Sequence, residues 1–211
     1  MRADWDVPIP MDDGIALRAD VFRPDEDGRY PVIMTHGPYA KWLAFQDGFP
    51  RQWANLEAEH PDALAGSSGL HMNWETVDAE KWVPDGYVVI RVDSRGAGRS
   101  PGFLDIFSAR ESRDCYLCIE WAADQPWSTG KVGLLGVSYY AINQWQVAAL
   151  QPPHLAAICP WEGGIGVPMR GHGVFVHTEA ADRPPDVFGG VTTLLSGGTN
   201  PSYLLLPVIP G

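Results

Sequence analysis

Short apolar runs alternate with helical patterns along the chain as far as residue 163. Four runs are rich in Val, Ile and Leu and predict buried strands at 30–35, 87–92, 132–135 and 155–159. Two more strands are expected at 5–9 and 17–22. They flank the segment MDDG, whose Asp-Gly pair tolerates positive φ, so they predict a hairpin.

Two segments between these runs have helical periodicity. In residues 109–125 the apolar side chains of Tyr116, Ile119 and Trp121 recur at helical intervals, with Ser108 as the expected N-cap. A second helix is expected at 139–150, where a Gln-Pro-Pro sequence ends it. Buried strands that alternate with helices predict an α/β fold, with a mostly parallel sheet and helices on both faces.

Two regions depart from this alternation. Residues 41–81 form a long, Trp-containing, turn-rich insertion, which is typical either of a cap over a site or of a surface excursion. From residue 164 to 211 the periodicity is lost, and the chain ends on the apolar run LLLPVIPG. We therefore expect the N-terminal portion of one domain at 1–163 and an irregular tail at 164–211.

The charge and the cysteines exclude several classes of protein. The net charge of −11 argues against nucleic acid and against an anionic membrane surface, because both need clustered Lys and Arg. Cys115 and Cys118 form a CxxC within the expected helix, without a second pair at zinc-ligand spacing, so we predict packing thiols and no metal or cofactor. The sequence shows neither a signal peptide nor an apolar run of transmembrane length, and a cytoplasmic location is expected.

The candidate chemistry lies in GKVGLLGVSYYAINQWQVAAL, where a strand leads into Gly136-Val137-Ser138 and a helix follows at once. This is the strand–turn–helix context of a nucleophile elbow, although Tyr140 replaces the second glycine of the G-x-S-x-G pattern. At the start of a helix the N–H of Tyr139 can donate to an oxyanion. On this motif alone Ser138 is equally well explained as a helix N-cap.

A second oxyanion donor is expected from the loop that follows the 30–35 strand, which reads His36-Gly37-Pro38-Tyr39. Pro38 has no N–H, so the Tyr39 hydroxyl is the better candidate, and a turn tyrosine with a buried edge is the alternative. A third segment, DSRGAGRS at 93–100, is glycine-rich but lacks the ending of a phosphate-binding loop. We expect a tight turn there, with Arg95 paired to a nearby acid.

Four blocks carry a resemblance to a known family: MDDGIALRADVFRP, YPVIMTHGPYAK, KWVPDGYVVIRVDSRGAGRSPG and EWAADQPWSTGKVGLLGVSYYAINQWQVAA. In content, order and spacing they resemble the X-Pro dipeptidyl-peptidase and cocaine-esterase-like serine hydrolases, over about residues 5–163. The resemblance implies an α/β-hydrolase fold with Ser138 as nucleophile. It also implies the Tyr139 N–H and the Tyr39 hydroxyl as oxyanion donors, and a structural role for the 93–100 loop.

The remaining catalytic partners are not found in the expected order. In α/β hydrolases an acid and then a histidine follow the nucleophile, but no histidine of this chain follows Asp182 or Asp186. Glu162 stands too close before His172 to lie on a separate strand. Members of the resembled family are much longer, so we expect a truncated or frame-shifted product with an incomplete C-terminus.

Two functions follow from these patterns. The first is a serine hydrolase that cleaves small esters, amides or short peptides through a Ser138 acyl-enzyme, with little activity in this chain alone. The second is a non-catalytic α/β module that binds a partner or ligand through its Trp-rich insertion.

Overall fold

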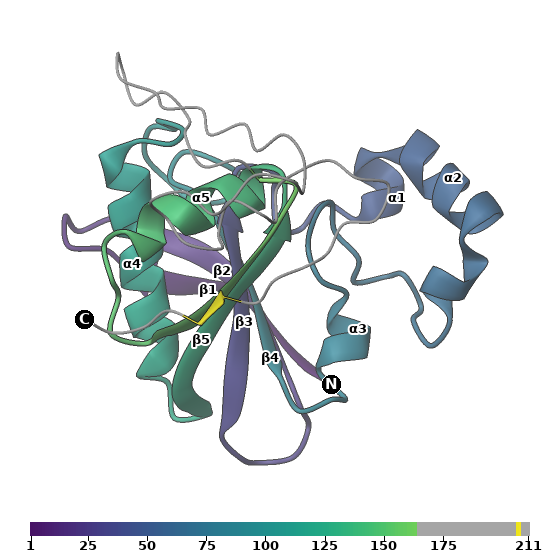
Figure 1. Cartoon of the computed structure of the whole chain (residues 1–211), viewed down its shortest axis with the longest axis horizontal. Helices are drawn as coiled ribbons and strands as arrows, with labels where there is room; N and C mark the ends of the chain where they lie inside the picture. Colours follow the sequence, from purple (N-terminus) through teal and green to yellow (C-terminus); the bar gives the residue numbers. More distant parts are fainter. Residues whose placement is uncertain (164–205, 208–211) are drawn as a thin grey trace, which may run out of the picture.

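The computed structural model describes residues 1–163 together with Leu206–Pro207, and these residues build a seven-stranded sheet in the order β1-β2-β4-β3-β5-β6-β7 (Figure 1). Strands β3 to β6 run parallel to one another, whereas β2 pairs antiparallel with β4 and β7 pairs antiparallel with β6. The strands are β1 Arg2–Pro10, β2 Ala16–Arg23, β3 Tyr30–Gly37, β4 Val88–Asp93, β5 Ser128–Val137, β6 Leu155–Trp161 and β7 Leu206–Pro207.

The N-terminal hairpin is confirmed. Strands β1 and β2 pair antiparallel, and the turn between them closes through the Met11 N–H, which donates to the Ile15 carbonyl at 2.8 Å. Gly14 has φ +85° in this turn, a conformation that glycine adopts without steric cost. The hairpin joins the sheet through β2, which pairs with β4.

The predicted buried strands form the parallel centre of the sheet. Gly37 at the end of β3 pairs in register with Asp93 at the end of β4, and Val137 at the end of β5 pairs with Trp161 at the end of β6. The carboxyl ends of all four strands therefore meet at one edge of the sheet. In open α/β sheets this is the edge at which sites form.

Helices cover both faces of the sheet, as expected. On one face α4 (Ala109–Ala123) and α5 (Tyr139–Ala148) pack over the larger core (Figure 1). The Ser108 hydroxyl caps α4 by accepting the Glu111 N–H at 3.1 Å, and both cysteines of the CxxC are buried in this core. On the other face α3 (Ala79–Trp82) contributes Ala79 to a smaller apolar cluster.

The insertion folds into short helices: α1 (Phe45–Gly48), α2 (Pro50–Glu59), the 3₁₀-helix η1 (Pro61–Leu64) and α3. Its aromatic side chains contact one another, and Phe49 stacks on Trp74 with ring centroids 4.1 Å apart. The Asn73 side-chain amide donates to the carbonyls of Ala40 at 3.1 Å and Leu43 at 2.7 Å. The insertion is thereby fastened to the loop that follows β3.

The expected tail at 164–211 lies outside the described residues, apart from the two residues of β7, which pair with Ala157 and Ile158 of β6. The expectation of a truncated or frame-shifted end is not tested by the described residues. Within them, none of the helices has the length and apolar character needed to cross a bilayer.

Candidate active site

Ser138 occupies a strained turn between β5 and α5. Its backbone has φ +55° and ψ −113°, a combination outside the regions that residues with a Cβ ordinarily adopt. The turn is held from the neighbouring strand, because the Ser138 N–H donates to the Trp161 carbonyl at 2.9 Å. A sharp, strained strand-to-helix turn of this kind defines a nucleophile elbow.

The interpretation of Ser138 as a simple N-cap is wrong. Its side chain makes no capping hydrogen bond to α5, whereas its backbone carbonyl accepts the N–H groups of Ala141 at 3.0 Å and Ile142 at 2.9 Å. A capping serine has extended backbone and an engaged hydroxyl. Ser138 has neither feature, so its hydroxyl is not committed to the helix.

Glycines around the elbow explain why a tyrosine is tolerated at position 140. A Cβ at Gly136 would lie 2.4 Å from the Tyr140 Cβ, and a Cβ at Gly37 would lie 2.3 Å from its ring. Tyr140 is buried, so its ring fills the space that these two glycines leave. In the usual G-x-S-x-G pattern the second glycine, at the position of Tyr140, makes room for close packing in the turn. Here Gly136 and Gly37, which lie against Tyr140, make that room instead.

Tyr39 lies beside the elbow, as its proposed role requires. Its ring contacts those of Tyr139, with centroids 5.9 Å apart, and Tyr140, with centroids 5.4 Å apart. Burial raises the pKa of the half-buried Tyr39 hydroxyl, and the carboxylate of Glu75 raises it further. The phenol is therefore neutral at neutral pH and keeps the proton that a hydrogen-bond donor needs.

Tyr139 is anchored by a buried carboxylate that the sequence patterns did not identify. The Tyr139 hydroxyl donates to Glu111, with both carboxylate oxygens at 2.7 Å. Glu111 also accepts the Ser94 hydroxyl at 2.7 Å and the Phe107 N–H at 2.7 Å. The Phe107 ring stacks on Tyr139 with centroids 4.3 Å apart, so the residue after Ser138 is fixed on two sides.

A second acidic residue missed from the sequence lies directly against the turn. The Glu75 carbonyl accepts the Val137 N–H at 3.2 Å, and Glu75 itself has φ +59°. Burial raises the pKa of the Glu75 carboxyl, and repulsion from Glu162 adds to this. The position of Glu75 in a turn-rich insertion gave no periodic signal that could have identified it.

The glycine-rich loop at 93–100 is structural, as expected. Arg95 pairs with the buried Asp114 of α4, with Nε to Oδ2 at 2.7 Å, and with Asp13 at 2.9 Å. These contacts tie the loop to α4 and to the hairpin turn.

Within residues 1–163 no histidine is hydrogen-bonded to Ser138. His36 is buried, with Nδ1 3.5 Å from the Ser94 hydroxyl, and burial lowers its pKa. His154 bonds Glu120 at 2.7 Å. His172, which we considered with Glu162, lies outside the described residues, and the described residues hold no cluster of three or more metal-ligating side chains.

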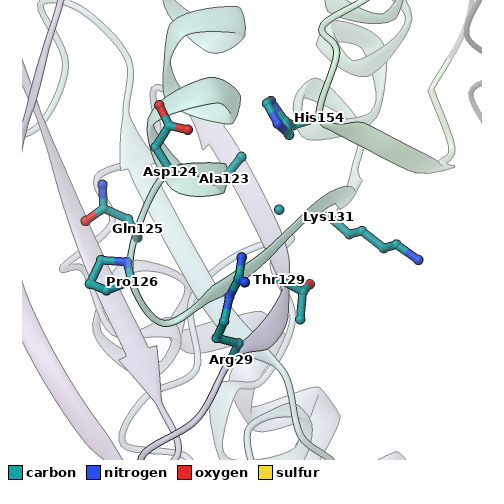
Figure 2. A pocket seen from close by; sticks show the side chains of 9 residues that line it. Arg29, Ala123, Asp124, Gln125, Pro126, Thr129, Lys131 and His154 are labelled. Carbon is teal, nitrogen blue, oxygen red and sulfur yellow. The ribbon is translucent and has the colours of Figure 1, made fainter.

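A pocket near His154 lies far from the elbow. It is lined in part by Arg29, by Gly130 near the start of β5 and by His154 just before β6, with the Arg29 side chain directed into it and Lys131 pointing away (Figure 2). Since β5 spans ten residues, this pocket is on the order of 30 Å from Ser138. It lies where strands β5 and β6 begin, whereas Ser138 lies where β5 ends.

The sheet order, the positive φ of Ser138 and the helix that follows define an α/β-hydrolase fold with a serine at its strand-to-helix elbow. Residues 13–183 match the model of the X-Pro dipeptidyl-peptidase (S15) family, and the chain belongs to that family of serine hydrolases.

Relatives and solved structures agree with this assignment. The cocaine esterase of Rhodococcus sp. (strain MB1 Bresler) is 32% identical over 154 residues, which is 73% of this chain and 22% of that protein. A CocE/NonD family hydrolase from Staphylococcus aureus is 40% identical, with a TM-score of 0.65 over 76% of this chain and 27% of that one. An α-amino acid ester hydrolase, 20% identical with a TM-score of 0.56, covers 78% of this chain and 26% of that one and shares the fold. The chain thus spans about a quarter of the length of these proteins.

Proposed function

We propose that this chain carries the nucleophile and the oxyanion donors of a hydrolase that cleaves small esters, amides or short peptides. The observation that carries the proposal is the backbone of Ser138, held at φ +55° in a turn whose hydroxyl is not used by the helix. Strain of this kind persists where the surrounding structure determines the conformation, and it concentrates at functional sites.

In the proposed reaction the Ser138 Oγ attacks the substrate carbonyl carbon and its proton passes to a base. The carbonyl oxygen becomes an oxyanion that accepts the Tyr139 N–H and the Tyr39 O–H. The tetrahedral intermediate then expels the alcohol or amine, which takes up the proton, and water hydrolyses the acyl-serine. Each oxyanion donor contributes roughly 3 kcal/mol to lowering the barrier.

The base is not supplied by residues 1–163. Without a base the hydroxyl of Ser138 is a weak nucleophile. No histidine of the chain follows Asp182 or Asp186, as the acid–histidine order of this fold requires, so we propose that the 211-residue chain alone has little or no turnover. A p-nitrophenyl ester assay tests this point, since a burst of product that disappears in Ser138→Ala would contradict it.

Phosphonylation by a fluorophosphonate probe tests the role of Ser138. A fluorophosphonate is far more electrophilic than an ester, so even a serine without a base is expected to react slowly with it. The expected result is a slowly formed probe adduct on the peptide that contains Ser138, absent from the Ser138→Ala variant. A silent Ser138 would favour the rival function, a binding module. One pocket of the structure supports that rival, because the exposed side chains of Trp5, Trp42 and Leu70 all line it. Capture of a partner that is lost in Trp42→Ala, together with an unlabelled serine, would establish the module.

A further inference from the structure

The loop that carries Tyr39 is built around one buried carboxylate. Asp93 ends β4, is fully buried, and lies beside Gly37 in the sheet register. Its Oδ1 accepts the Lys41 N–H at 2.7 Å and its Oδ2 accepts the Arg99 N–H at 2.8 Å. One side chain therefore joins the loop after β3 to the glycine-rich loop after β4.

The glycine-rich loop is shaped to admit this carboxylate. Gly98 has φ +52°, and a Cβ at this position would lie 2.2 Å from the Asp93 Oδ2. Any other residue at 98 would displace the carboxylate from its two N–H donors. Gly98 of the glycine-rich loop therefore leaves the space that the Asp93 carboxylate occupies.

Lys41 is held at its side chain as well as at its backbone. Its ammonium is buried and bonds Asp20 of β2 at 2.8 Å and Asp6 of β1 at 3.3 Å. Asp20 is itself buried, and its Oδ1 also accepts the Asp6 N–H at 2.9 Å. The residue two positions after Tyr39 therefore cannot shift without separating a buried ion pair.

The residue between Tyr39 and Lys41 is strained. Ala40 has φ +63°, which a residue with a Cβ adopts only when its surroundings impose it. Lys41 is fixed on one side of it, and the Ala40 carbonyl accepts the Asn73 amide at 3.1 Å and the Leu43 N–H at 3.0 Å. The direction in which Tyr39 leaves the backbone depends on this conformation.

We propose that Asp93 is a positioning residue of the hydrolytic reaction: through the Lys41 N–H it holds the strained turn at Ala40 and so directs the Tyr39 hydroxyl toward the oxyanion. The proposal rests on the proposed function, in which Tyr39 is an oxyanion donor. Burial raises the pKa of Asp93, whereas the two N–H donors and the Lys41 ammonium oppose that rise. The carboxylate and its donors therefore stabilise one another, and removing either side loosens the loop.

A double-mutant cycle on the rate of fluorophosphonate labelling tests the proposal. The variants are Tyr39→Phe, Asp93→Ala and the double variant. Glu120→Gln is the control, because it also removes an acidic side chain but lies on α4 beside His154, far from the elbow. Tyr39→Phe is expected to slow labelling about 100- to 1000-fold, the effect of one lost oxyanion donor. Asp93→Ala is expected to slow it by a similar factor, and the double variant is expected to be no slower than Tyr39→Phe, because Asp93 acts through Tyr39.

The outcomes separate the positioning role from the proposed function. The role of Asp93 is overturned if the double variant is slowed by the product of the two single factors. It is also overturned if Asp93→Ala is labelled at the wild-type rate. Either result leaves Tyr39 as a donor. A wild-type rate in Tyr39→Phe overturns Tyr39 as a donor and the positioning role with it. Where Asp93→Ala does not fold, Asp93→Asn replaces it in the cycle, since it keeps one acceptor and is expected to slow labelling less.

Hydrogen–deuterium exchange tests the clamp without any reaction. Exchange of the amides at 39–42 is expected to accelerate at least about tenfold in Asp93→Ala, because the Lys41 N–H loses its buried acceptor, while the amides of β6 keep their wild-type rates. Unchanged exchange at 39–42 overturns the proposal even if Ser138 proves unreactive.

Discussion

The strain at Ser138 predicts that replacing this serine with glycine stabilises the protein. At φ +55° and ψ −113° a Cβ is crowded by its own backbone, and a conformation of this kind costs about 1–3 kcal/mol. Glycine adopts it freely but loses about 0.5–1 kcal/mol because its unfolded state is more flexible. Ser138→Gly is therefore expected to be about 0.5–2 kcal/mol more stable than Ser138→Ala.

The comparison with alanine isolates the strain. Ser138→Ala keeps the Cβ and removes a hydroxyl that makes no capping bond, so its stability is expected to stay close to that of the wild type. The assay is urea unfolding of both variants, followed by circular dichroism. With a slope of about 2 kcal/mol per molar urea, the midpoint of Ser138→Gly is expected to exceed that of Ser138→Ala by about 0.3–1 M.

A second alanine–glycine pair serves as the control. Ala54 is exposed within helix α2 and does not have a positive φ, so Ala54→Gly relieves no strain and is expected to lose about 0.5–1 kcal/mol. A Ser138→Gly variant that unfolds at the same urea concentration as Ser138→Ala, or at a lower one, would show that the elbow stores no strain.

Three further predictions concern the surroundings of the elbow. Tyr139→Phe removes the hydroxyl that donates to buried Glu111 and is expected to lower the free energy of unfolding by about 1–3 kcal/mol in the same urea assay; a loss below about 0.3 kcal/mol would contradict the anchoring role. Burial lowers the pKa of His36, so below its ordinary pKa of about 6.5 the unfolded state takes up a proton that the folded state does not. Stability is then lost as the pH falls, by up to about 1.4 kcal/mol per pH unit, and an equal slope in His36→Gln would show that another group is responsible. The three cysteines are all buried, and a thiol reagent such as Ellman's reagent is expected to modify them only at the rate of unfolding; immediate modification in native buffer would show an open core.

The strands, the two long helices and the elbow could be predicted because each is encoded by neighbouring residues. The run at 132–135 is apolar at every position, Ser108 precedes the helical periodicity it caps, and Ser138 lies where strand pattern changes to helix pattern. The predicted ends were short: β5 begins at Ser128 and β6 reaches Trp161. Backbone pairing with neighbouring strands continues a strand past its apolar run. The sequence around a strand does not show which strands will pair with it, so these extensions could not be predicted.

The buried carboxylates could not be predicted, because their partners are distant in the chain. Glu111 and Tyr139 are 28 residues apart, and Asp93 and Lys41 are 52 apart. Moreover, the Ser108-x-x-Glu111 spacing resembles a capping box, in which the acid would bond its own N-cap. In the structure the carboxylate bonds the Phe107 N–H and the Tyr139 hydroxyl instead, so the acid links the helix to the elbow.

The most direct test of the account is the crystal structure of the chain phosphonylated at Ser138. If these two groups form the oxyanion site, the phosphonyl oxygen is expected to lie within hydrogen-bond distance of both the Tyr139 N–H and the Tyr39 hydroxyl. A phosphonyl oxygen that faces away from both donors, or a probe attached to a different serine, would contradict it.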